Sequence, residues 1–191
     1  MAGKIILASN SPRRKQLLKM AGIRFTVIPS DVPEMVPSFI TDENRAQFLA
    51  ELKSSAMSVF HPKDIIIGAD TTVLCEGRLL GKPKTAEEAK EMLRFLSGKV
   101  HTVRTGVSLI YNDMEDADSF TSETKVEFYP LTEEQIEEYV ASGEPMDKAG
   151  AYGIQGLGCT LVKRIEGDYY TVVGLPIAEV VRRLKAHEKE E

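Results

Sequence analysis

Short runs of β-branched residues alternate with helical segments along this chain, and this pattern restricts the possible folds more than any other feature. The first run, Lys4-Ile5-Ile6-Leu7-Ala8, is typical of a buried strand. Ser11-Pro12 places an N-cap residue before a proline at the first helical position, and Gly22 is a typical helix end. The run at 64–75 turns back into Leu79-Leu80 as a hairpin. Helical connections combined with antiparallel hairpins predict an α/β fold with a mixed sheet.

The same reading predicts the remaining elements. A helix of about 18 residues from Thr41 is expected to bury one apolar face, made of Ala46, Leu49, Leu52, Ala56 and Val59 or Phe60. Capping boxes at Thr85-x-x-Glu88 and Thr132-x-x-Gln135 each predict a helix start. Further strands are expected near 100–111, 119–129, 159–165 and 168–173, and Pro176 opens a C-terminal helix.

Composition excludes several classes of protein. The 191 residues are 42% hydrophobic and 28% charged, which fits one globular domain spanning residues 1–191. Cys75 and Cys159 lie far apart, which excludes a disulfide scaffold and a CxxC site, and the isolated histidines give no support to a His-rich metal site or a Ser-His-Asp triad. No apolar run approaches the about 18 residues of a membrane span. The N-terminus lacks the pattern of a signal peptide, so we expect a cytoplasmic protein without a membrane partner.

Charge is distributed unevenly along the chain. The net charge of −5 argues against a dedicated nucleic-acid binder. Residues 1–24 nevertheless hold six basic residues and no acid: Lys4, Arg13, Arg14, Lys15, Lys19 and Arg24. A small basic focus on an acidic chain suits a compact anion better than a polymer backbone.

The basic focus coincides with the start of the first predicted helix. The residues there are Ser9-Asn10-Ser11-Pro12-Arg13-Arg14. A helix N-terminus attracts anions, and arginine binds phosphate through two parallel hydrogen bonds. Lys82 in Gly81-Lys82-Pro83 is a second candidate phosphate contact, although this stretch is not a Walker A motif.

Asp70 is the main candidate for a catalytic or metal-binding carboxylate. It stands at the end of the apolar run Ile65-Ile66-Ile67-Gly68-Ala69, where the sites of α/β sheets usually lie. Such a carboxylate can hold a divalent cation or accept a proton from water.

Taken together, these stretches resemble the Maf family of nucleoside triphosphate pyrophosphatases. The resemblance extends from residue 4 to about residue 185, with the motifs in the family's order. It rests on LASNSPRR at 7–14, Glu34, Lys53, GADT at 68–71, GKP at 81–83, LSG at 96–98, EPMDKAGAYGIQG at 144–156 and VGLP at 173–176.

The resemblance implies a mixed α/β fold related to the inosine triphosphate pyrophosphatase superfamily, with two lobes around a cleft. It also implies a homodimer and a divalent metal cofactor, magnesium or manganese. The implied reaction hydrolyses a nucleoside triphosphate to the monophosphate and pyrophosphate. Arg13, Thr71 and Gln155 match the specificity positions of the subgroup that acts on dTTP and UTP, and Asp70 matches the family's proton acceptor.

The chemistry of these residues agrees with the resemblance. A triphosphate carries about four negative charges, which Arg13, Arg14, Lys53, Lys82 and a metal could balance. Ser9 would add a neutral donor, while Glu34 and Asp70 would hold the metal or activate water. The sequence does not divide these two roles between the two carboxylates.

Two alternatives remain at this point. One is a non-catalytic regulator of septum formation that binds nucleotides or nucleic acid. Glu34 and Asp70 argue against it, because a pure anion binder gains nothing from carboxylates beside phosphate. The other is a house-cleaning enzyme for purine triphosphates such as inosine triphosphate.

Overall fold

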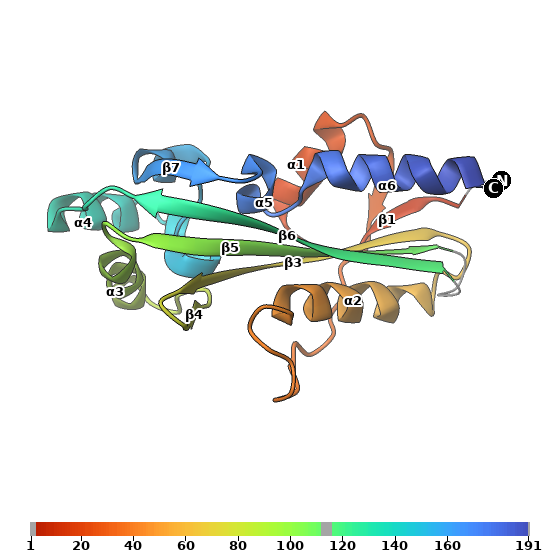
Figure 1. Ribbon diagram of the computed structural model, residues 1–191, viewed down its shortest axis with the longest axis horizontal. Coiled ribbons are helices and arrows are strands. Elements are labelled where there is room, and N and C mark those ends of the chain that lie inside the picture. The colour runs from red at the N-terminus through yellow and green to blue at the C-terminus, as the bar shows by residue number, and fades with distance from the viewer. Residues whose placement is uncertain (1–2, 112–115, 191) are drawn as a thin grey trace. The chain divides into compact units, whose positions relative to one another are not determined.

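The computed structural model describes residues 3–111 and 116–190 (Figure 1). Its strands form a seven-stranded sheet in the order β2-β1-β3-β5-β6-β7, with β4 paired to β3. β1 is parallel to β2 and β3, whereas β4 and β7 are antiparallel to β3 and β6. The predicted mixed sheet is therefore confirmed.

The elements follow the predicted alternation closely. The strands are β1 Ile5–Leu7, β2 Phe25–Val27, β3 Ile65–Cys75, β4 Arg78–Leu80, β5 Val100–Tyr111, β6 Asp116–Phe128 and β7 Val162–Glu166. The α-helices are α1 Pro12–Met20, α2 Arg45–Ser58, α3 Ala86–Leu96, α4 Glu133–Ala141, α5 Tyr169–Val173 and α6 Ile177–Glu190. Three 3-10 helices lie between α4 and β7: η1 Glu144–Asp147, η2 Ala149–Ala151 and η3 Gly156–Thr160.

The chain divides into two compact units. The first comprises Met1–Asp70, Thr105–Ser122 and Gly174–Glu191, and the second comprises Thr71–Arg104 and Glu123–Val173. Strands β3, β5 and β6 each contribute residues to both units. The description of residues 1–191 as a single domain stays a prediction.

In the first unit, α2 and α6 cover opposite faces of the sheet (Figure 1). Two glycines allow α2 to approach very closely. A Cβ on Gly68 would lie 2.2 Å from the carbonyl oxygen of Ala50, and one on Gly106 would lie 2.3 Å from the backbone nitrogen of Gln47. Such separations are far below van der Waals contact, so both positions require glycine.

This close approach selects a different face of α2 from the predicted one. The buried residues are Ala46, Leu49, Ala50, Ser54, Met57 and Ser58. Ala46 and Leu49 were predicted correctly, whereas Leu52 and Ala56 are only half-buried and Val59 and Phe60 are exposed. Ala46, Ala50 and Ser54 lie against the two glycines, where the closely spaced backbones leave no room for a larger side chain. Ser54 also donates a hydrogen bond of 2.8 Å to the buried hydroxyl of Ser108.

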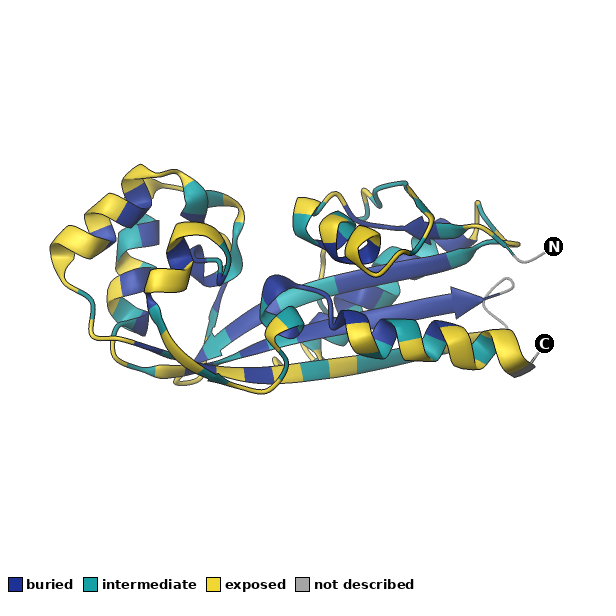
Figure 2. Ribbon diagram, turned by 90° about the horizontal axis from the view of Figure 1, so that it is seen from above, coloured by how far each residue is buried: buried dark blue, intermediate teal, exposed yellow. Residues whose placement is uncertain are grey.

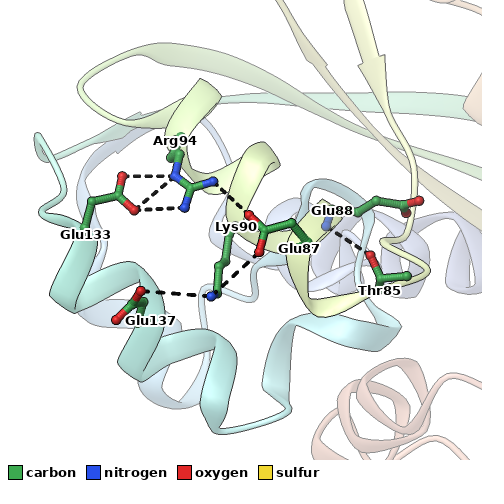
Figure 3. A network of polar contacts seen from close by, with 7 residues as sticks. All are labelled: Thr85, Glu87, Glu88, Lys90, Arg94, Glu133 and Glu137. Carbon is green, nitrogen blue, oxygen red and sulfur yellow. Dashed lines mark hydrogen bonds and ion pairs between the residues drawn. The ribbon is translucent and has the colours of Figure 1, made fainter.

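The second unit has its own core, in which α3 and α4 pack against strands β3 to β6. Its buried residues include Leu93, Leu96, Phe128 and Ile136, and Figure 2 shows the buried faces of both helices. On their solvent side, Arg94 binds Glu133 at 2.9 Å and Glu87 at 3.2 Å (Figure 3). These ion pairs are exposed, so they contribute little beside the apolar core.

The predicted strand at 168–173 is wrong, because residues 169–173 form helix α5. Asp168 accepts hydrogen bonds from the backbone N–H and the hydroxyl of Thr171, at 2.8 and 3.0 Å. This capping arrangement starts a helix and prevails over the β-propensity of Tyr-Tyr-Thr-Val-Val. Among the described residues, no helix has both the length and the apolarity that a membrane crossing requires.

Candidate active site

The turn between β1 and α1 in the first unit is organised by serine hydroxyls. Ser11 caps α1 by accepting a hydrogen bond from the Arg14 N–H at 3.4 Å, and Pro12 follows at the first helical position. The hydroxyl of Ser9 accepts the Ser11 N–H at 3.2 Å. The predicted helix start is therefore confirmed.

Arg14, which was predicted to bind phosphate, is buried in the structure. Its Nε donates to the carbonyl oxygen of Gly174 at 2.8 Å, and its Nη1 donates to the hydroxyl of Ser9 at 3.1 Å. Burial lowers the pKa of the guanidinium, the charges of Asp70 and Glu34 oppose this, and Arg13 adds to it. Arg14 thus fixes the turn from inside, whereas Arg13 is half-buried on the same helix.

Lys53 on α2 joins the two predicted carboxylates. Its Nζ lies 2.6 Å from Oδ1 of Asp70 and 2.7 Å from Oε1 of Glu34. The side chain of Asp70 is 16% exposed and that of Glu34 is 55% exposed, so the cluster opens toward solvent on the Glu34 side. A ligand can therefore reach these charges without any rearrangement of the core.

The parallel pairing of β1 with β3 explains why these residues meet. Leu7 lies opposite Ile67, and the Ala8 N–H donates to the Ile67 carbonyl at 2.9 Å. β1 then ends, while β3 continues to Asp70. Asp70 thus lies within β3, which runs on to Cys75, and not at a strand end as expected; the close approach of α2 at Gly68 brings Lys53 to it. The first unit thus gathers Ser9, Arg14, Glu34, Lys53 and Asp70 from four separate segments.

The donor set fits a divalent cation held jointly with a substrate. Glu34 and Asp70 both approach one cationic point, which is the ammonium of Lys53. Within residues 3–111 and 116–190, no group of three or more His, Cys, Asp or Glu side chains is placed to form a complete metal site. Magnesium commonly binds one or two carboxylates and takes its other ligands from water and phosphate. The two carboxylates suit that mode.

The other three predicted site residues belong to the second unit. Lys82 is exposed, and its loop is fixed by a 3.0 Å hydrogen bond from the Gly150 N–H to the Gly81 carbonyl. Gln155 is half-buried at the N-cap position of η3, and Thr71 is half-buried in β3. The predicted joint action of Arg13, Thr71 and Gln155 stays a prediction.

The model of the Maf-like protein family matches residues 4–187 of this chain. The chain belongs to the Maf family. This match spans the residues of both units, including the serine and arginine turn, the Asp70 strand and the glycine-rich segment at 144–156.

Close relatives in the Maf family are found in several bacilli. A dTTP/UTP pyrophosphatase of Bacillus cytotoxicus is 52% identical over 95% of this chain and 94% of its own. Proteins of the same name from Bacillus mycoides and a Geobacillus species are each 50% identical, over 98% and 95% of this chain and 97% of their own. A HAM1 protein from Coxiella burnetii shares the fold, with a TM-score of 0.50 at 15% identity over 99% of this chain and all of its own. This likeness agrees with the expected mixed α/β fold.

Sequence reasoning missed two features of this arrangement. The carbonyl of Gly174 is a partner of Arg14, although the only signal was the motif VGLP at 173–176. Gly106 is as necessary as Gly68 for the placement of α2, and it stands as a lone glycine in a long β-branched run. A glycine inside a strand pattern is a known sign of close backbone approach.

Proposed function

We propose that this protein is a nucleoside triphosphate pyrophosphatase that hydrolyses dTTP and UTP to the monophosphate and pyrophosphate. The observation that carries the proposal is the cluster of Lys53, Glu34 and Asp70 beside the capped start of α1. It combines phosphate-binding cations with carboxylates, which hydrolysis requires and anion storage does not. Relatives of about half identity named dTTP/UTP pyrophosphatase support the choice of substrate.

The residues of the first unit would divide the work on the triphosphate. Lys53 and Arg13 would bind phosphate oxygens, while Arg14 and Ser9 hold the turn at the start of α1 in place. Asp70 would accept a proton from the water that attacks the anhydride bond between the α- and β-phosphates. Lys82 of the second unit would add a further positive charge for the phosphates.

Glu34 and Asp70 are the residues that would hold magnesium or manganese. When bound, such an ion neutralises phosphate charge and polarises the reacting phosphoryl group. The ammonium of Lys53 lies at the point where both carboxylates converge, so we expect Lys53 to turn toward phosphate oxygen when the triphosphate binds.

The specificity for thymine and uracil would come from Arg13, Thr71 and Gln155. A glutamine amide offers both a donor and an acceptor, which matches the carbonyl and N–H edge of these bases. A purine would leave that amide unpaired, at a cost of about 1–3 kcal/mol.

The deciding experiment is a pyrophosphate-release assay with magnesium or manganese across a panel of triphosphates. We expect pyrophosphate and no orthophosphate from dTTP and UTP. A chain that binds these nucleotides without turnover would be the non-catalytic regulator, and preferred turnover of inosine triphosphate would identify the purine enzyme. We also propose a homodimer in the cytoplasm, which light scattering on the purified protein and cell fractionation test.

A further inference from the structure

The segment around Gln155 is held by side chains that are distant in the sequence. On one side, the Gly153 N–H donates to the hydroxyl of Tyr139 at 3.1 Å. On the other, the Leu157 N–H donates to Oε2 of Glu144 at 2.9 Å. The motif at 144–156 therefore folds back on itself within the second unit, so that its first residue supports its last ones.

Glu144 performs for η3 the task that an N-cap side chain normally performs. Gln155 occupies the N-cap position with extended backbone angles, φ −90° and ψ 167°, yet its side chain makes no capping hydrogen bond. The orphan N–H of Leu157 in the first turn is satisfied by Glu144 instead. No hydrogen bond joins the Gln155 amide to any part of the chain at 3–111 or 116–190. The amide is therefore available to a ligand.

Two glycines make room for this arrangement. Gly156 has a φ of +64°, and a Cβ there would lie 2.2 Å from Oε1 of Glu144. A Cβ on Gly153 would lie 2.7 Å from Cε of Lys148. Any side chain at either position would displace the residue that supports the segment.

Lys148 also stabilises the segment around Gln155. Its side chain is 12% exposed, and its ammonium donates to the carbonyl oxygen of Glu144 and to Oδ1 of Asp147, the latter at 2.6 Å. Lys148 therefore holds the backbone of Glu144 while its stem covers Gly153.

We propose that Glu144 is a positioning residue that keeps the amide of Gln155 available for the base of the substrate. This inference rests on the proposed function, in which Gln155 reads the base. Without the Glu144 carboxylate, the N–H of Leu157 loses its acceptor, and the side chain of Gln155, which stands at the N-cap position of η3, becomes a candidate to replace it. An amide engaged in capping cannot pair with uracil or thymine, so selectivity would fall while the phosphate chemistry continues.

The test compares Glu144→Met, which keeps the volume but cannot accept the hydrogen bond, with Glu144→Gln, which can. We expect Glu144→Met to lower the ratio of kcat/KM for UTP over GTP about tenfold, and Glu144→Gln to stay within about threefold of wild type. Glu138→Ala on the exposed side of α4 is the matched control and should leave the ratio unchanged. Glu144→Ala replaces Glu144→Met should the latter fail to fold.

A second arm separates this inference from the proposed function. Hydrogen exchange of the Leu157 amide and the side-chain amide resonances of Gln155 report the cap without any turnover. We expect Glu144→Met to speed Leu157 exchange at least tenfold and to shift the Gln155 resonances. In a Gln155→Ala background, Glu144→Met should change selectivity no further. Unchanged exchange at Leu157, or an equal loss of selectivity with and without Gln155, overturns the inference. A wild type without pyrophosphatase activity overturns the proposed function alone.

Discussion

The ammonium of Lys53 lies 2.6 Å from Oδ1 of Asp70, so the residue expected to bind phosphate is ion-paired with the residue expected to accept a proton. The pair is only slightly exposed, and Glu34 provides a second partner at 2.7 Å for the same nitrogen. Phosphate oxygens are alternative partners for that ammonium. We therefore expect substrate binding to redistribute the contacts of Lys53 between phosphate and the two carboxylates.

Replacing Asp70 tests the chemical step. Asp70→Asn keeps the shape of the side chain but removes its charge, so we expect the rate of pyrophosphate release to fall by about 10²–10⁴. Asp42→Asn, at an exposed position, is the control. Steady-state rates on dTTP measure the effect on the reaction, and circular dichroism confirms that each variant is folded. A correctly folded Asp70→Asn protein of normal activity would refute the assignment.

Replacing Arg14 should lower stability, whereas replacing Lys82 should weaken substrate binding. Arg14→Ala leaves the Gly174 carbonyl and the Ser9 hydroxyl without their buried partner, so we expect a loss on the order of 2–4 kcal/mol of unfolding free energy. Lys82→Ala removes an exposed side chain, so stability should hold while KM for the triphosphate rises. Urea denaturation and kinetics on both variants distinguish the two outcomes. Arg24→Ala serves as the control, and similar kinetics for Arg24→Ala and Lys82→Ala would mean that the site is misplaced.

Gly68→Ala should uncouple α2 from the sheet. The new Cβ would lie 2.2 Å from the Ala50 carbonyl, so overpacking should cost about 1–3 kcal/mol or more. Activity should fall as well, because the same shift moves Lys53 away from Asp70. Gly81→Ala is the stability control, since nothing lies within 4 Å of its Cβ position. Equal melting temperatures for the two variants would contradict the role given to Gly68.

His101 should make the stability of the second unit depend on pH. Its ring is buried against Phe128 and Tyr152, and burial lowers its pKa to about 4 from an ordinary value of 6.5. Between pH 6.5 and pH 4 the histidine is protonated in the unfolded chain but neutral in the folded protein. Acidification therefore favours the unfolded chain, and the contribution of buried His101 to stability is complete above pH 6.5 and declines toward pH 4. We expect a loss of about 3 kcal/mol across that range.

His101→Gln cannot titrate there, and it retains a group that can bond the Tyr152 hydroxyl. Denaturant unfolding of both proteins between pH 4 and pH 7 measures the difference. The wild type should lose more stability than the variant on acidification, and parallel pH profiles would show that His101 is not responsible.

Selectivity tests the base-reading residues directly. We expect dTTP and UTP to be hydrolysed about ten- to a hundredfold better than ATP and GTP, measured as kcat/KM. Gln155→Glu removes a donor and adds a charge, so it should erode this preference. Equal turnover of all four nucleotides by the wild type would defeat the prediction.

Local signals in the sequence were sufficient for most of the elements. Ser11-Pro12 gave the start of α1, Thr132 and Gln135 form the predicted capping box, and the hairpin after Cys75 is present. Such features depend on contacts within a few residues, which the order of residues already contains. The helix at 169–173 differs from the predicted strand because Asp168 caps its first turn, whereas the run Tyr-Tyr-Thr-Val-Val by itself favours a strand.

The candidate site depends on both the amino-acid sequence and the tertiary structure. The sequence by itself determined which residue types carry the chemistry and in what order, since the motifs are contiguous strings. Only the tertiary structure decided that Arg14 is buried on Gly174, that Lys53 lies between Glu34 and Asp70, and that α2 packs Ala46, Ala50 and Ser54 against Gly68 and Gly106. These outcomes depend on strand pairing and on two glycines that let a helix approach. Contacts between segments distant in the chain follow from packing, which no local pattern encodes.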